Sequence, residues 1–250
     1  MFWRPWAFEH ANRFLNWVKN LQPDESNFTD MDNTDTRFAD RVDAGQQLAA
    51  RLADMNLDRP IIFALPRGGV PVAAEIAERL KAPLDLILVR KIGAQNNPEL
   101  ALGAIAEGGD QEVIINEDVW MMTRTEPVYF NEAKAAQEEE LVRRQERYLG
   151  DRARLDPKDR TVVVVDDGVA TGATMKAALT ALNKRGARRV IVALPVGPED
   201  TLHGLSDMAD DIVCLRRMVQ FHGVGEFYRD FHQLSDDETV ALLNRQDASS

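Results

Sequence analysis

One segment, Thr161–Ala178 (TVVVVDDGVATGATMKAA), constrains the fold and the ligand of this chain more than any other. Its run of four valines is typical of a central parallel strand that is covered on both faces. Two carboxylates, Asp166 and Asp167, follow at the end of that strand, and a turn of small residues leads into a helix from about Thr174. Because the first turn of a helix has unpaired N–H groups and the positive end of the helix dipole, this turn is a candidate phosphate site.

The acidic pair narrows the class of ligand. Two carboxylates repel a phosphate, whereas the hydroxyls of a sugar donate hydrogen bonds to carboxylates. The segment therefore predicts a sugar phosphate, and the alternative, an ordinary strand, turn and capped helix, leaves the paired aspartates without a packing reason. Neither G-x-x-x-x-G-K-[ST] nor G-x-G-x-x-G occurs in the chain, which argues against a nucleoside-triphosphate loop and a dinucleotide fold.

The motif VVVVDDGVATGATM resembles the signature of the type I phosphoribosyltransferases, which bind phosphoribosyl pyrophosphate (PRPP). The resemblance implies a Mg²⁺-dependent enzyme that transfers the phosphoribosyl group from PRPP to a nitrogenous base and releases diphosphate. It implies that Asp166 and Asp167 are catalytic and hold the ribose hydroxyls, directly or around the Mg²⁺ ion. The residues implied to bind the 5′-phosphate are Ala170, Thr171, Gly172, Ala173 and Thr174.

A second loop, Ala64–Pro71 (ALPRGGVP), directly follows the first predicted strand. Arg67 supplies a fixed cation beside Gly68 and Gly69, where the backbone can approach a ligand closely. The resemblance implies that this loop binds diphosphate, that Arg67 is a catalytic residue, and that the peptide bond between Pro66 and Arg67 is cis. The alternative is a plain strand-to-helix turn with a solvent-facing Arg67.

Arg90 and Lys91 follow the second predicted strand, and the residues from Gln95 to Pro98 favour a loop over a helix. Members of the resembling family carry a mobile loop here that closes over the reaction and excludes water. The resemblance implies that Arg90 binds diphosphate and that Lys91 is catalytic, and the alternative is a solvated basic pair. Glu99 and Glu107 are acid/base candidates that nothing distinguishes from surface carboxylates.

The segment Phe221–Phe231 (FHGVGEFYRDF) is rich in aromatic residues. Enzymes of the resembling family have a small variable hood here, at about residues 215–235, in which an aromatic ring stacks on the base. Phe221, Phe227 and Tyr228 are the candidates for base stacking. The alternative is that all three only pack the hood onto the core.

The sequence does not identify the acceptor base, because its motifs combine features of different classes within the resembling family. Enzymes for 6-oxopurines usually carry an Asp directly before the Thr-Gly of the signature and a Lys after the next strand, where this chain has Ala170 and Leu194–Gly197. Ala170 is shared with adenine- and uracil-type signatures. The sequence Arg67-Gly68-Gly69 is closer to the diphosphate loop of the oxopurine enzymes.

From Arg37 onward, the chain alternates between helix and strand patterns. Helices are predicted at 37–55, 70–80, 132–150, 174–184 and 199–208, and strands at 60–65, 84–89, 162–165, 189–194 and 211–215, with a loop and short strands at 90–116. This alternation predicts an α/β fold in residues 37–250, a parallel twisted sheet with helices on both faces. Ligands of such sheets bind beyond the carboxyl ends of the strands, where the acidic pair lies.

Residues 1–36 lie outside the resemblance and differ from the rest. Trp3, Phe14, Trp17 and Leu21 belong to a mostly apolar stripe at helical spacing, and Asp24–Asp35 has the acidic, polar composition of a flexible tether. We expect an N-terminal helix whose stripe docks on its own domain or on a sister subunit of a homo-oligomer, makes a weak membrane contact through residues 1–21, or binds another protein.

Composition limits the partners and the compartment. The formal net charge of -11 opposes non-specific binding of nucleic acid, and the single cysteine, Cys214, excludes an intramolecular disulfide. No apolar run has transmembrane length and the N-terminus lacks the apolar core of a signal peptide, so we expect a cytoplasmic protein. The alternative to an enzyme is a non-catalytic sensor of PRPP or a nucleotide that acts through a protein or membrane partner.

Overall fold

The computed structural model describes residues 36–107, 112–150 and 152–249. The chain divides into two units, residues 1–36 and 37–250. The apolar stripe and the acidic tether predicted within the first unit lie outside the described residues. The helices and strands that the structure describes all belong to the second unit.

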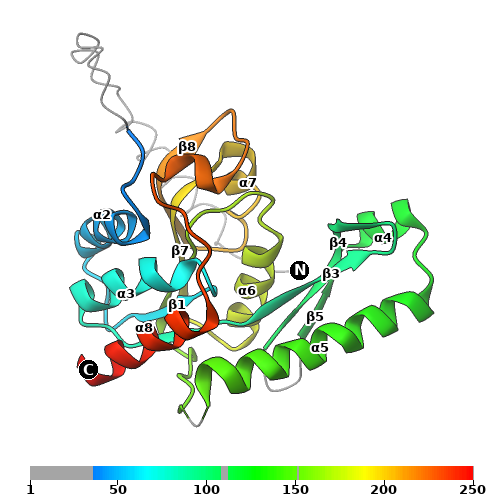
Figure 1. Ribbon diagram of the computed structural model, residues 1–250, viewed down its shortest axis with the longest axis horizontal. Coiled ribbons are helices and arrows are strands. Elements are labelled where there is room, and N and C mark those ends of the chain that lie inside the picture. Colours follow the sequence, from blue (N-terminus) through cyan, green and yellow to red (C-terminus); the bar gives the residue numbers. More distant parts are fainter. Residues whose placement is uncertain (1–35, 108–111, 151, 250) are drawn as a thin grey trace, which may run out of the picture. The chain divides into compact units, whose positions relative to one another are not determined.

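Strands and helices alternate along this unit as the sequence predicts, except between residues 84 and 149, where four strands are followed by two helices (Figure 1). The helices are α2 (Arg41–Ala53), α3 (Gly69–Leu80), α4 (Glu117–Thr123), α5 (Pro127–Leu149), α6 (Ala173–Lys184), α7 (Glu199–His203) and α8 (Asp236–Ser249), with the 3-10 helix η2 (Val224–Phe227). The strands are β1 (Ile61–Ala64), β2 (Leu84–Leu86), β3 (Val89–Ala94), β4 (Asn97–Ala106), β5 (Glu112–Ile115), β6 (Thr161–Val165), β7 (Arg189–Pro198) and β8 (Asp211–Met218).

The main sheet has five parallel strands in the order β2-β1-β6-β7-β8. The valine run forms β6 at its centre, where Val163 lies opposite Ile62 of β1 and Ile191 of β7. All five residues of β6 are buried. The prediction of a central parallel strand is therefore confirmed.

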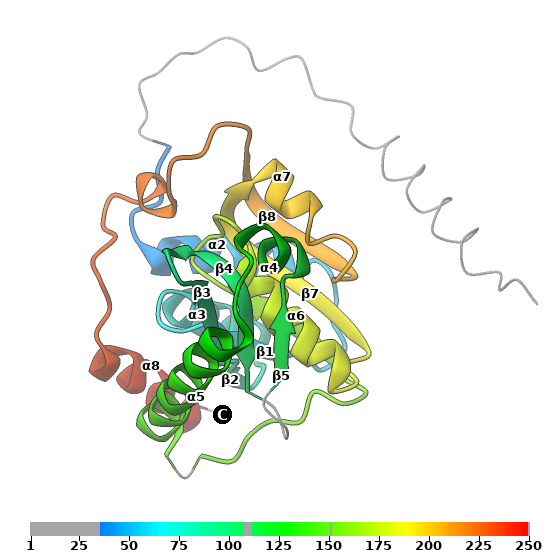
Figure 2. The same ribbon diagram turned by 90° about the vertical axis from the view of Figure 1, so that its right-hand side faces the viewer.

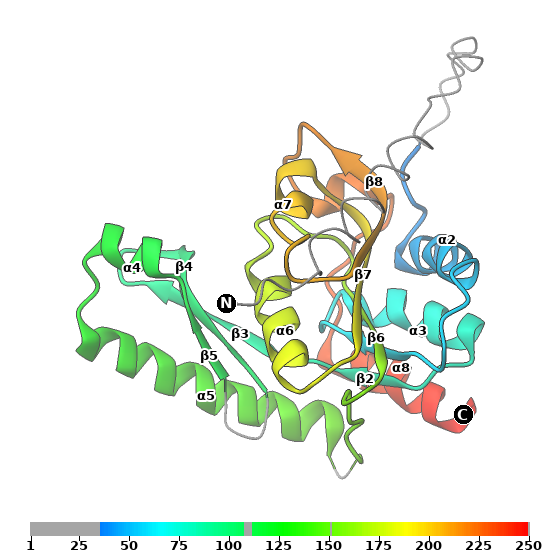
Figure 3. The same cartoon turned by 180° about the vertical axis from the view of Figure 1, so that it is seen from behind.

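Helices cover both faces of this sheet, with α2 and α3 on one side and α6 and α7 on the other (Figures 1 and 3). Because side chains alternate along a strand, Ile62 and Val163 pack into the core beneath α2, α3 and α8. Phe63 and Val164 point the other way, into the core beneath α6 and α7. The α/β fold class predicted from the sequence is confirmed.

A second sheet, β3-β4-β5, is antiparallel and packs against α6, α5 and α4. The loop and short strands predicted at 90–116 are confirmed: β3 and β4 form a β-hairpin that turns at Gln95 and Asn96, and β5 follows. Helix α5 begins at Pro127 rather than at Glu132, because proline suits the first position of a helix, where its missing N–H has no partner to lose.

The carboxyl-terminal part of the unit departs most from the prediction. Strand β8 continues to Met218, beyond the end at residue 215 predicted for this strand, and the segment from Val219 to Ser235, which includes η2, leads to α8. Helix α8 is an addition to the predicted elements. Its start carries a capping box, in which the Ser235 hydroxyl and backbone N–H both bond to the Glu238 carboxylate and the Glu238 N–H returns to the hydroxyl.

Membrane-spanning helices were searched among the described residues. In residues 36–107, 112–150 and 152–249, no helix combines the length and apolar composition that crossing a bilayer requires.

Candidate functional site

The two loops predicted to bind the ligand lie side by side. From β1 the chain proceeds to β2 on one side, whereas β6, β7 and β8 continue on the other, so the order of the strands reverses between β1 and β6. Ligand sites of open parallel sheets form at such a reversal, beyond the carboxyl ends of the strands. The backbone N–H of Leu65, after β1, donates to the carbonyl of Val165 at the end of β6 (2.9 Å).

Glycine is required where these loops touch. A Cβ atom at Gly68 would lie 2.0 Å from Oδ2 of Asp167, and one at Gly69 would lie 2.6 Å from the carbonyl oxygen of Val165. Both distances are far below van der Waals contact: a side chain at Gly69 would clash with backbone, and one at Gly68 would displace the Asp167 carboxylate. The peptide bond between Pro66 and Arg67 is cis, as expected.

The two carboxylates of the acidic pair have different partners. Oδ1 of Asp166 accepts a hydrogen bond from the backbone N–H of Asp167 (2.9 Å), and burial together with the negative charge of Asp167 raises the pKa of Asp166 well above its ordinary value. Oδ2 of Asp167 accepts from Nε of Arg41 (2.8 Å). Burial raises the pKa of Asp167 too, but the Arg41 guanidinium opposes that rise.

The predicted phosphate cradle is the turn between β6 and α6. Gly172 caps α6 with φ of +77°, in the left-handed region that favours glycine, and no side chain bonds to the free N–H groups at this cap. Thr171 and Thr174 are both exposed. The Thr201 hydroxyl stabilises the turn by donating a hydrogen bond to the carbonyl of Ala170 (2.6 Å). The N–H groups and hydroxyls of residues 170–174 are therefore available to an anion.

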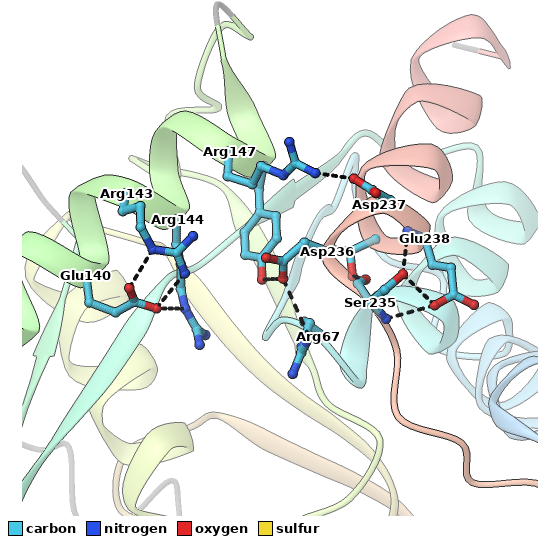
Figure 4. Close-up of polar contacts among 11 residues, drawn as sticks. Arg67, Glu140, Arg143, Arg144, Arg147, Ser235, Asp236, Asp237 and Glu238 are labelled. Atoms are coloured by element: carbon cyan, nitrogen blue, oxygen red, sulfur yellow. Dashed lines mark hydrogen bonds and ion pairs between the residues drawn. The ribbon is translucent and has the colours of Figure 1, made fainter.

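Arg67 extends toward the junction of α5 and α8 (Figure 4). Its Nη1 lies 3.6 Å from Oδ1 of Asp236, and both side chains are 31% exposed. The Tyr148 hydroxyl donates to the same oxygen (2.6 Å), and burial together with this hydrogen bond raises the pKa of Tyr148 to about 12. The neighbouring Asp237 pairs with Arg147.

Arg90 and Lys91 lie on β3, in a cavity of about 330 Å³ against α5 that Tyr129 and Gln137 also line. Nε of Arg90 donates to Oε1 of Gln137 (2.9 Å), and burial and nearby Arg144 lower the pKa of Arg90. Contact of Arg90 and Lys91 with diphosphate remains a prediction.

The aromatic candidates of the hood divide into two groups. Phe221 and Phe227 are half-buried and stack on each other, with ring centroids 5.6 Å apart. Tyr228 is buried between Phe38 and Phe231, and its hydroxyl donates to the carbonyl of Asp167 (2.6 Å). The prediction that Tyr228 stacks on a base is wrong, because its ring is covered by the chain itself; base stacking by Phe221 or Phe227 remains a prediction.

Two residues that contact the predicted site, Arg41 and Asp236, are absent from the sequence-based prediction. Arg41 is 126 residues from its partner Asp167, and no short motif marks it. The capping box at Ser235 and Glu238 is a sequence signal for α8, but it does not indicate that Asp236 meets Arg67.

A metal ion would have few protein ligands here. Among the residues that the structure describes, no cluster of three or more His, Cys, Asp or Glu side chains could hold a metal ion. Mg²⁺ often binds one or two carboxylates and takes its other ligands from water and substrate phosphates. Asp166 and Asp167 suit such a Mg²⁺ site, with one or two protein carboxylates and the remaining ligands from water and substrate.

Residues 38–225 match the family model described as the phosphoribosyl transferase domain. The chain belongs to the phosphoribosyl transferase family. Two Mycobacterium tuberculosis proteins, from strains CDC 1551 / Oshkosh and H37Rv, are provisionally assigned as phosphoribosyl transferases; each is 46% identical over 208 residues, which is 83% of this chain and 46% of the relative. The chain thus spans about half the length of these relatives. TT1426 from Thermus thermophilus, whose crystal structure is known, is 43% identical in sequence to this chain. The alignment covers 84% of this chain and 99% of TT1426, and the two structures superpose with a TM-score of 0.73.

Membership of the phosphoribosyl transferase family confirms the resemblance stated from the VVVVDDGVATGATM motif. The match ends at residue 225, so the last part of the hood and α8, which carries Asp236, lie beyond it.

Proposed function

We propose that this phosphoribosyl transferase moves the 5-phosphoribosyl group of PRPP to a nitrogenous base and releases diphosphate. One observation carries the proposal: at the reversal of strand order, the loop with Arg67 touches Asp167, and the turn of residues 170–174 continues from the same acidic pair. A cation loop, a carboxylate pair and a phosphate cradle thus lie in series, matching the diphosphate, ribose and 5′-phosphate of PRPP.

The residues have separate roles in this proposal. Asp166 and Asp167 accept hydrogen bonds from the ribose hydroxyls, and the N–H groups and hydroxyls from Ala170 to Thr174 bind the 5′-phosphate. Arg67, with the backbone of Gly68 and Gly69, binds diphosphate. Mg²⁺ bound beside the acidic pair would neutralise charge on the leaving diphosphate.

In the transfer, a nitrogen lone pair of the base forms a bond to the anomeric carbon while the bond from that carbon to the diphosphate oxygen breaks. The electrons of the broken bond leave with diphosphate, and the proton on the attacking nitrogen passes to solvent. Positive charge develops on the ribose ring in the transition state, so carboxylates fixed beside the ribose stabilise it.

A turnover assay tests the reaction. Labelled PRPP and Mg²⁺ are incubated with the protein and one base per reaction, and diphosphate release is measured. The bases are adenine, hypoxanthine, guanine, xanthine, uracil and orotate. We expect release with one class of base and none after the double substitution Asp166→Asn and Asp167→Asn. Tight PRPP binding without turnover on any base would favour the sensor alternative.

Calorimetry with Arg67→Ala tests the assignment of the diphosphate loop. A charge-assisted hydrogen bond contributes about 1.5–3 kcal/mol, so binding of diphosphate should weaken by about tenfold to a hundredfold and binding of ribose 5-phosphate far less. Arg59→Ala is the control, since the Arg59 side chain is 84% exposed and pairs only loosely with Asp58 (3.6 Å). Equal losses for both ligands would remove Arg67 from the diphosphate site.

A further inference from the structure

Asp167 is held by parts of the chain that are far apart in sequence. Its Oδ2 accepts from Nε of Arg41 (2.8 Å), and the Asp167 and Arg41 side chains are 14% and 9% exposed. The same oxygen lies against the backbone of Gly68 in the diphosphate loop. The main-chain carbonyl of Asp167 accepts from the Tyr228 hydroxyl of the hood (2.6 Å).

Arg41 is itself fixed by the hood. It is the first residue of α2, its Nη1 donates to the carbonyl of His232 (2.9 Å), and its guanidinium carbon lies 4.0 Å from the centre of the Phe231 ring. One edge of the guanidinium is thus directed at Asp167, one nitrogen at the hood, and one face at an aromatic ring. This geometry suits action on a ligand through Asp167 rather than by direct contact.

The ion pair between Arg41 and Asp167 matters because it offsets one of the two negative charges of the acidic pair. Two adjacent carboxylates in a partly buried site repel each other, and water compensates them poorly there. The guanidinium of Arg41 compensates one of the two and binds it at a defined oxygen. Loss of Arg41 would remove the cation that holds the Asp167 carboxylate beside Gly68.

We propose that Arg41 is a positioning residue, which fixes the carboxylate of Asp167 between the diphosphate loop and the hood so that the acidic pair meets the ribose in one geometry. This inference rests on the proposed function, because it assigns Arg41 a role in binding PRPP.

A double-mutant cycle separates action through Asp167 from other effects. The dissociation constant of PRPP with Mg²⁺ is measured by calorimetry for wild type, Arg41→Met, Asp167→Asn and the double variant. We expect Arg41→Met to weaken binding by about tenfold to a hundredfold. In the Asp167→Asn background the same substitution should add less than about twofold, because its partner is already neutral. Arg41→Lys, which keeps the charge but not the forked donor geometry, should lie in between.

Arg185→Met is the matched control. Arg185 also donates to a carbonyl, that of Leu155 (3.0 Å), and lies over an aromatic ring, Phe63, but it sits at the opposite end of α6 from the phosphate turn. We expect this variant to lose thermal stability and keep the affinity for PRPP.

Three outcomes would overturn the inference. Wild-type affinity in Arg41→Met, or losses that multiply in the double variant, would mean that Arg41 does not act through Asp167 while leaving the proposed function intact. If wild type binds no PRPP, the proposed function fails and the inference fails with it. Should Arg41→Met not fold, Arg41→Lys replaces it in the same cycle, with the same criteria.

Discussion

The guanidinium of Arg67 lies 3.6 Å from the carboxylate of Asp236, which also accepts a hydrogen bond from the Tyr148 hydroxyl. The cation of the loop that we propose to bind diphosphate therefore already faces an anion supplied by the first turn of α8. An anionic ligand at Arg67 has to compete with that carboxylate.

We expect Asp236→Asn to tighten the binding of inorganic diphosphate. Partly exposed ion pairs contribute about 0.2–1 kcal/mol, so the gain should be about 1.4-fold to fivefold at low salt and smaller at high salt. Calorimetry at two salt concentrations measures it. Asp237→Asn is the control, because Asp237 pairs with Arg147 instead of Arg67; an equal gain in both variants would indicate a general charge effect and not competition at Arg67.

Asp166→Asn should stabilise the chain at the expense of ligand binding. Burial and the charge of Asp167 raise the pKa of Asp166, so the folded chain keeps this proton to a higher pH than the unfolded chain. The contribution of Asp166 to stability is therefore greatest at low pH and falls as pH rises toward the raised pKa. Asparagine does not ionise, so the variant does not lose stability at this position as pH rises. We expect it to be more stable than wild type by about 1 kcal/mol at pH 8 and by little at pH 4.

Urea unfolding at several pH values checks this expectation, with Asp167→Asn as the contrast. That substitution breaks the buried pair with Arg41 and should destabilise the chain by about 3 kcal/mol near neutral pH. A stability difference for Asp166→Asn that is the same at pH 4 and pH 8 would contradict the assigned pKa shift.

Arg154→Met should be among the most destabilising single changes outside the site. Nε of Arg154 lies 3.1 Å from Oδ2 of Asp85, and its other nitrogens bond to both carboxylate oxygens of Glu107. Asp85 and Glu107 are buried, so removal of the guanidinium leaves two buried carboxylates without it, and we expect a loss of about 3–5 kcal/mol in urea unfolding.

Arg188→Met provides the comparison for that measurement. Arg188 meets Asp58 at 3.5 Å, but the side chains are 56% and 65% exposed, and such pairs contribute less than about 1 kcal/mol. Similar losses in the two variants would show that burial does not set the strength of these pairs.

Removal of residues 1–36 should leave the affinity for PRPP unchanged. Every residue assigned to the site lies at Arg41 or beyond, within the unit of residues 37–250. The apolar stripe predicted from the spacing in this segment would need a partner, so we expect the deletion to alter the oligomeric state or vesicle binding, measured by light scattering and co-sedimentation. If both stay unchanged while thermal stability falls substantially, the stripe belongs to the core of its own domain.

The parts of the site that the sequence predicts are those whose signal is local. The valine run, the acidic pair and the turn to Thr174 are contiguous, and the strand-to-helix context fixes where they lie in a parallel sheet. The loop at Arg67 likewise follows a buried strand. The adjacency of the two loops is a consequence of β1 and β6 being neighbours.

The remaining parts depend on contacts between distant segments. Arg41 begins an ordinary amphipathic helix, and only the folded chain shows that its guanidinium reaches Asp167. The cluster of aromatic residues around Tyr228 favours a role in binding the base, but burial against Phe38 commits the Tyr228 ring to packing. The residues from Gln95 to Pro98 predict the turn within the loop and short strands at 90–116, but the bounds of the strands depend on the pairing of β3 with β4.

Helix α5 connects two distant parts of the molecule. Its C-terminal end meets α8 through Tyr148 and Asp236, as Figure 2 shows for the two helices, and near its other end the Tyr129 hydroxyl donates to the carbonyl of Gly93 in β3. The two tyrosines are about 28 Å apart along a straight helix. Two tyrosine hydroxyls thus link Asp236, the ion-pair partner of Arg67, to the strand that carries Lys91 through a single helix.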